Sequence, residues 1–120
     1  MLDIKNCLLV VIDIQDKLVK AGFNGDLCEE KAAKICKAAN ILNIPTIITE
    51  QYPKGLGHST DTIMANTANN IHIIEKTSFS AYSESEFQQE LNKSLESIDF
   101  SFYTFIDFTN SAFNVFVGSE

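Results

Sequence analysis

A continuous aliphatic run, LLVVIDI at residues 8–14, constrains the fold of this chain more than any other feature. An unbroken β-branched and aliphatic run of this length is typical of a strand buried on both faces, because a half-exposed strand would alternate apolar and polar residues. Helices must then cover both faces of its sheet. The run therefore predicts an α/β fold, and it places Asp13 near the carboxyl end of a central strand.

Helix and strand patterns alternate after this run. Asp26 and Glu29 have the spacing of a capping box, so a helix is predicted from Asp26, with Asn43 and Pro45 ending it. Its apolar stripe is expected to comprise Cys28, Ala32, Ile35, Ala39 and Leu42. Further strands are predicted at residues 46–49 and 71–75.

A second capping box is predicted at Ser83 and Glu86. The helix that follows would carry an apolar face of Phe87, Leu91, Leu95 and Ile98. Strands and helices in this order predict a mostly parallel sheet, because right-handed crossovers bring the carboxyl ends of the strands to one edge. Open α/β sheets bind their ligands at that edge.

Asp13, Glu50 and Lys76 each stand at or just beyond the end of a predicted strand. Asp13 is interpreted either as a general base or charge partner, or as a capping group for a nearby helix or loop. Lys76 is either a cation that keeps Asp13 ionised or a solvated lysine at a strand end. This convergence is the main functional signal that patterning alone provides.

Glu50, Gln51 and Tyr52 open a loop that continues as PKGLGHS. Loops at this edge often contact substrate, so these three residues are predicted to bind it; a packed turn set by the loop's proline and glycines is the alternative. His58 is expected in this loop and His72 within a strand. Neither they nor the scattered carboxylates have a metal-ligand spacing, and we predict no metal and no cofactor.

Composition narrows the class of partner. The net charge is −7, and all nine cationic residues are lysines, which argues against a nucleic-acid surface and leaves small molecules or proteins. No apolar run approaches the ~20 residues that span a bilayer, and no signal-peptide pattern opens the chain, so a cytoplasmic protein is expected. Three cysteines without a C-x-x-C pair favour reduced core thiols.

The composition changes near residue 99. Most of the nine phenylalanines lie beyond this point, at Phe100, Phe102, Phe105, Phe108, Phe113 and Phe116. Residues 1–98 are therefore predicted to form one unit, and residues 99–120 a Phe-rich tail in which Phe100–Phe108 reads as a fourth strand.

Three motifs resemble the isochorismatase-like cysteine hydrolase family: LLVVIDIQDKL at 8–18, ITEQYPKGLGHS at 48–59 and KTSFSAY at 76–82. They occur in the family's order, and the resemblance covers about residues 5–95. The middle motif is most similar to the metal-independent branch that contains the isochorismatase-domain-containing proteins. The resemblance implies a Rossmann-like three-layer α/β/α sandwich with a mostly parallel sheet, and it makes a homo-oligomer the expected assembly.

The resemblance also implies a catalytic Asp, Lys and Cys. Asp13 matches the Asp that deprotonates the thiol and water, and Lys76 matches the Lys that supports the thiolate and the carboxylate. The metal-binding branch has Asp and His after the second strand; here that position reads Thr49-Glu50-Gln51-Tyr52, so no metal site carries over.

The sequence departs from the family at the nucleophile. No cysteine follows Cys36, and the family's turn aligns with Asp107 and Phe113 instead of Gly and Cys. Three explanations for this departure stay open: residues 99–120 are translated from a shifted reading frame, the chain is a short variant with a degenerate site, or the domain has decayed to a non-functional product. We expect a domain of a family that hydrolyses C–N or related bonds of small molecules. Because the cysteine is absent, we expect these 120 residues to have no hydrolase activity. The alternative is a pseudoenzyme or truncated product that binds a small ligand or a protein.

Overall fold

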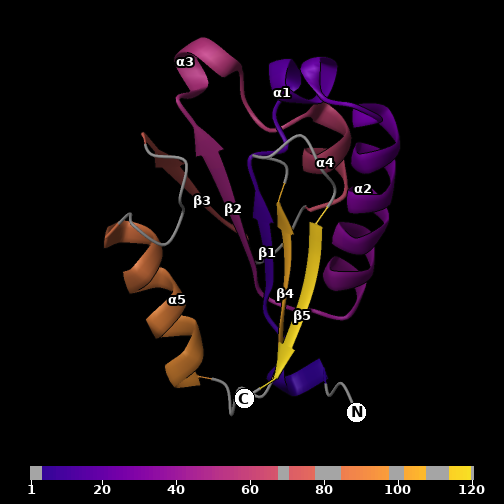
Figure 1. Cartoon of the computed structure of the whole chain (residues 1–120). Helices are drawn as coiled ribbons and strands as arrows, with labels where there is room; N and C mark the ends of the chain where they lie inside the picture. The colour runs from indigo at the N-terminus through magenta and orange to yellow at the C-terminus, as the bar shows by residue number, and fades with distance from the viewer. Residues whose placement is uncertain (1–3, 68–70, 78–84, 98–101, 108–113, 120) are drawn as a thin grey trace.

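A computed structural model of the chain describes residues 4–67, 71–77, 85–97, 102–107 and 114–119, with side chains described, Asn6 aside, up to residue 93. These residues form a single five-stranded sheet with helices on both of its faces (Figure 1). The fold class predicted from the sequence, a mostly parallel α/β sandwich, is confirmed.

The sheet has the strand order β3-β2-β1-β4-β5. The buried run supplies the central strand β1 (Leu9–Ile12), which pairs in parallel with β2 (Thr46–Gln51) and with β4 (Phe102–Asp107). Strand β3 (Ile71–Lys76) continues the parallel set beyond β2, and β5 (Asn114–Ser119) runs antiparallel to β4. The carboxyl ends of the four parallel strands therefore share one edge, here called the carboxyl edge.

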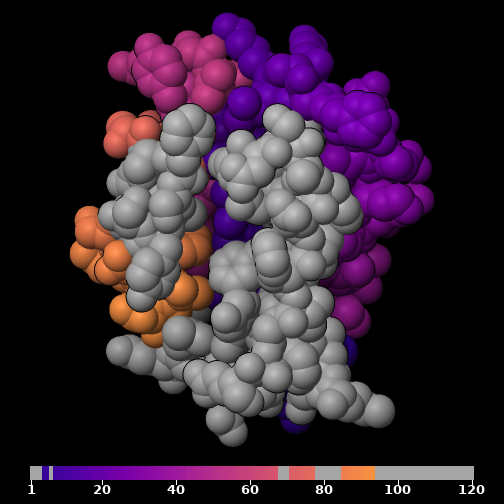
Figure 2. Space-filling view, in the orientation of Figure 1, coloured from indigo at the N-terminus to yellow at the C-terminus, as the bar shows by residue number. Residues whose placement is uncertain are grey.

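Two helices of ordinary length cover opposite faces of the sheet. Figure 1 shows α2 (Gly25–Ile41) on one side, together with the short α4 (Asp61–Ala65), and α5 (Ser85–Ser97) on the other. Two more short helices, α1 (Asp16–Ala21) and α3 (Pro53–Leu56), stand next to each other above the carboxyl edge (Figures 1 and 2), and a 3-10 turn at Ile4–Asn6 precedes β1.

The side chains of β1 pack alternately into the two hydrophobic clusters, one on each face of the sheet. Leu9 and Val11 pack on the α2 side against Ile48 and the buried stripe of α2. Val10 and Ile12 pack on the α5 side, in a cluster with Leu8, Ile47, Ile74 and Phe87. This two-sided burial is the physical reason for the unbroken aliphatic run.

The predicted start of the first long helix was wrong. Helix α2 begins at Gly25, its N-cap is Asn24 in a left-handed conformation, and Asp26 lies in the first turn and does not cap it. A Cβ at Gly25 would stand 1.9 Å from the carbonyl oxygen of Val19, so the close approach of α1 leaves room only for glycine at the first residue of α2. The predicted end is confirmed, and the stripe is buried except for half-buried Ile35 and exposed Leu42.

Some predictions concern residues outside the described ranges. Ser83 and Ile98 are among them, so that capping box and one end of that apolar face stay predictions; Phe87 is buried as expected. A strand is present at Phe102–Asp107, within the predicted range, whereas the division into 1–98 and 99–120 stays a prediction. Among the described residues, no helix is long and apolar enough to cross a membrane.

Candidate active site at the carboxyl edge

Asp13 is the first residue after β1, and its backbone is unusual. Its φ is +57°, in the left-handed region, which glycine adopts freely and which asparagine, aspartate and histidine adopt more often than other residues. Its N–H donates to the carbonyl oxygen of Thr49 at 3.1 Å, and its own carbonyl accepts from the N–H of Gln15 at 3.0 Å. The residue is fully buried, so its carboxylate requires compensating partners.

Lys76 provides the opposite charge. Its Nζ lies 2.6 Å from Oδ2 of Asp13, and both side chains have no solvent exposure. The sequence predicted a strand at residues 71–75 with Lys76 just after it. In the structure, Lys76 is the last residue of β3. The structure thus brings together the two residues that were predicted as catalytic, in a buried ion pair at the carboxyl edge.

Thr49 completes this cluster and was missed as a site residue. Its Oγ1 donates to Oδ1 of Asp13 at 2.7 Å, within the interior. The available signal was a polar side chain two residues after Ile47 in a buried strand, since alternate residues share a face. We call Asp13, Thr49 and Lys76 the buried carboxylate cluster.

Glu50 does not join this cluster. It lies inside β2, and because side chains alternate along a strand, it points to the α2 side while Thr49 points to the α5 side. Its Oε2 accepts from the backbone N–H of Ser59 at 2.5 Å, and its Oε1 lies 3.1 Å from Nδ1 of His58. These contacts are those of a packed turn, the alternative interpretation from the sequence, and the predicted role of Glu50 in substrate binding stays a prediction.

The electrostatics of this second pair follow from its contacts. Burial by itself would raise the pKa of Glu50, but the hydrogen bonds from Ser59 and His58 outweigh it and lower that pKa. The exposed His58 has a raised pKa, mainly because its side chain is hydrogen-bonded to Glu50 and also feels that carboxylate's charge. The hydrogen bonds of Glu50 to His58 and Ser59 hold the end of the loop against β2. Glu50 lies on the α2 side of the sheet, whereas the buried carboxylate cluster lies on the α5 side.

Gln51 and Tyr52 occupy different environments. The backbone of Gln51 is held on both sides by Gln15, whereas its side chain is half-buried. Tyr52 is 59% exposed, in a left-handed conformation, and its ring lies so close to Gly55 that a Cβ there would clash with it. Their predicted role in substrate binding stays a prediction.

Gln15 is the other residue that the sequence analysis missed. It is fully buried, and its Nε2 donates to the carbonyl oxygens of Gln51 at 2.9 Å and Gly57 at 2.6 Å. Its Oε1 accepts from the N–H of Gln51 at 2.7 Å. One amide therefore ties both ends of residues 51–57, here called the α3 loop, to the chain just after Asp13.

The three cysteines are all buried and free, as predicted. Cys7 precedes β1 and Asp13 follows it, so up to about 20 Å of extended chain separates the two residues. Cys28 and Cys36 face the core from α2. Burial raises the pKa of Cys28 to about 11, with Glu29 adding to it, and raises that of Cys36 to about 12.

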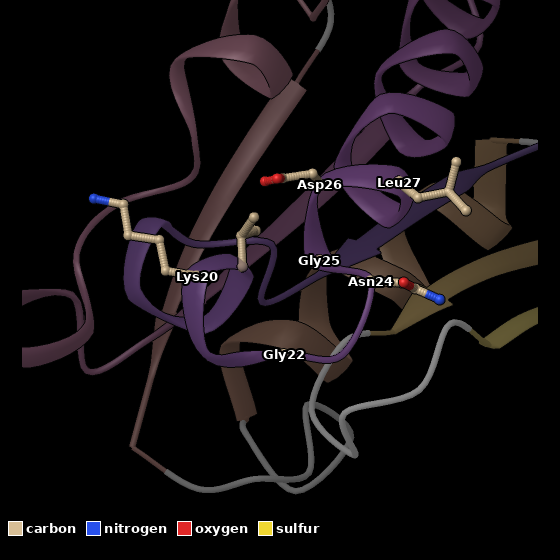
Figure 3. A pocket seen from close by; sticks show the side chains of 7 residues that line it. Lys20, Gly22, Asn24, Gly25, Asp26 and Leu27 are labelled. Atoms are coloured by element: carbon tan, nitrogen blue, oxygen red, sulfur yellow. The ribbon is translucent and has the colours of Figure 1, made fainter.

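A surface hollow of about 480 Å³ lies elsewhere, between α1 and the first turn of α2 (Figure 3). Lys20, Asn24, Asp26 and Leu27 are among its lining residues, and none of the buried carboxylate cluster lines it. Within the described part of the chain, no group of His, Cys, Asp and Glu side chains is arranged to hold a metal ion.

The sequence is similar to a known protein family and to several of its members. The sequence model of a family described as "Isochorismatase domain" matches residues 7–98. The chain is 40% identical over 84 residues to the isochorismatase domain-containing protein 2 of Danio rerio, covering 70% of the chain and 41% of that protein. It is 39% identical over 75 residues to the isochorismatase family protein 1A of Dictyostelium discoideum, covering 61% and 36%.

Solved structures of other proteins have a similar fold. The MAR1 ribonuclease structure from Caenorhabditis elegans superposes with a TM-score of 0.75 at 32% identity, covering 88% of this chain and 52% of that one. The YcaC gene product of Escherichia coli, described as an octameric hydrolase of unknown specificity, gives 0.74 at 16% identity with the same coverage, and at that identity it supports the fold alone. The chain spans about 40% of the length of the two curated relatives.

Proposed function

Because the chain belongs to the isochorismatase domain family, we propose that its Asp13–Lys76 pair forms part of a cysteine-hydrolase site for small molecules. The observation that supports the proposal best is the 2.6 Å contact between two fully buried opposite charges at the carboxyl edge. A buried charge pair of this kind is costly in a purely structural role and is common at functional sites.

In the proposed reaction, Asp13 acts as a base. It takes the proton of a cysteine thiol, and the thiolate attacks the carbonyl or imine-like carbon of the substrate. The same proton then passes to the leaving group. Asp13 next takes a proton from the water that attacks the covalent adduct and returns it to the departing cysteine thiolate, which restores the thiol and the carboxylate. Lys76 balances the charge of the carboxylate and supports the thiolate.

We infer that residues 1–120 place no thiol in this site. Cys7 lies at the opposite edge of the sheet, and Cys28 and Cys36 face the core from α2 with raised pKa values. We therefore propose that these 120 residues by themselves are inactive as a hydrolase. This arrangement favours a second candidate function, in which the domain binds a small ligand or a protein as a pseudoenzyme.

Small molecules are the proposed substrates, and RNA is not. The Caenorhabditis elegans relative is described as a ribonuclease, but this chain carries a net charge of −7 and no arginine, which disfavours contact with a phosphate backbone. The octameric description of the Escherichia coli protein supports self-association as a proposal for this chain as well.

A turnover assay tests the proposal. We expect the 120-residue chain to hydrolyse small amides, imides and vinyl ethers no faster than buffer does, because no thiolate reaches Asp13. The control is the Asp13→Ala variant, which should behave identically. Turnover by the unmodified chain that disappears in Asp13→Ala would contradict the proposed inactivity.

A further inference from the structure

We propose that Thr49 is a positioning residue, which holds Asp13 in its left-handed conformation and keeps its carboxylate charged and aimed at Lys76. This proposal rests on the proposed function of the Asp13–Lys76 pair and deepens it. Thr49 contacts Asp13 at two points: its carbonyl oxygen accepts from the Asp13 N–H at 3.1 Å, and its hydroxyl donates to Oδ1 at 2.7 Å.

The need for positioning follows from the alternation of side chains along β1. Val11 belongs to the α2-side cluster and Ile12 to the α5-side cluster. In a continued extended strand, position 13 would therefore point to the α2 side. Lys76 lies on the α5 side, because it stands two residues after Ile74 in β3. An extended Asp13 would point away from its partner.

The left-handed conformation resolves this conflict. At φ +57° the chain leaves the strand geometry, and the Asp13 carboxylate reaches the α5 side, where Thr49 and Lys76 contact it. Non-glycine residues persist in this region only when their surroundings hold them there. The register pairs Ile12 with Thr49, so Thr49 stands beside the residue at which β1 ends.

The hydroxyl suits a base that gains and loses a proton. A threonine hydroxyl carries one donor and two acceptor sites, so it donates to the carboxylate and can accept from the protonated acid. Donation to the charged form favours that form. Lys76 is the charged group that faces the carboxylate from β3. Glu50 and Glu75 each adjoin Thr49 or Lys76 in their strands, so the alternation of side chains points them to the other face.

The test compares Thr49→Val, which removes the hydroxyl and keeps the shape, with Thr49→Ser, which keeps the hydroxyl. Protonation of Asp13 is followed by the chemical shift of its ¹³C-labelled carboxyl group as the folded protein is titrated with acid. We expect Thr49→Val to raise the midpoint by about one pH unit, a tenfold gain in proton affinity. Thr49→Ser should restore the midpoint of the unmodified chain.

A residue with only a packing role would give a different result. Thr49→Val would then change the urea midpoint but leave Asp13 ionised over the same folded pH range, and that outcome overturns the proposal. If Thr49→Val does not fold, Thr49→Ala replaces it with the same expectations. The readout needs no turnover, so a failed hydrolase proposal and a failed role for Thr49 remain distinguishable.

Discussion

Replacement of Lys76 by methionine is expected to lower the free energy of unfolding by about 3–5 kcal/mol. Methionine fills a similar volume but leaves the carboxylate of Asp13 buried without the cation that now lies 2.6 Å from it. The buried anion must then remain uncompensated or take up a proton, and either change destabilises the fold. Urea denaturation at neutral pH measures the loss.

Two controls sharpen this experiment. Lys34→Met breaks a 3.4 Å pair with Glu30 on the exposed surface of α2, and it should change stability by less than about 0.5 kcal/mol. The double variant Asp13→Asn with Lys76→Met removes both charges and should recover most of the loss. A loss below about 1 kcal/mol for Lys76→Met alone would contradict a buried, mutually dependent pair.

Replacement of Gln15 by leucine is expected to have the second largest effect, about 2–4 kcal/mol. The three hydrogen bonds of its amide hold Gln51 and Gly57, and leucine would leave one N–H and two carbonyl oxygens without those partners. The loss should concentrate in the α3 loop, since both of its ends depend on this amide. We expect faster proteolysis between Tyr52 and Ser59 together with a lower urea midpoint.

Gln51→Ala is the matched control for this prediction. The bonds from Gln15 go to the backbone of Gln51, so truncation of the Gln51 side chain keeps all of them. Its stability change should stay below about 1 kcal/mol, and the loop should resist protease as before. Equal losses in Gln15→Leu and Gln51→Ala would argue against a clamp formed by Gln15.

The sequence was informative where one physical requirement dominates. Strand β1 buries both faces, so its residues had to be aliphatic, and its place at the centre of the sheet could be predicted. The pairing of Asp13 with Lys76 was inferred because parallel strands end at one edge. The short helices α1 and α3 were not predicted, since four to six residues are too few for an apolar stripe to become visible.

Other features depend on contacts between distant segments. The left-handed conformation of Asp13 and its bond to Thr49, 36 residues along the chain, arise only when β1 and β2 pair. Gln15 reaches Gly57 across 42 residues and has no local signature. Glu50 was grouped with Asp13 because both follow apolar runs, but the strand continues to Gln51, so its alternation sends Glu50 to the opposite face.

The reactivity of the cysteines tests the central claim most directly, namely that these residues hold the charged pair of a hydrolase site without its thiol. The folded chain is mixed with a chromogenic disulfide at mildly alkaline pH, and thiol release is followed before and after addition of urea. We predict that the three cysteines, all buried, react only on unfolding. A thiol that reacts rapidly in the folded chain, and more slowly after Asp13→Asn, would contradict the account.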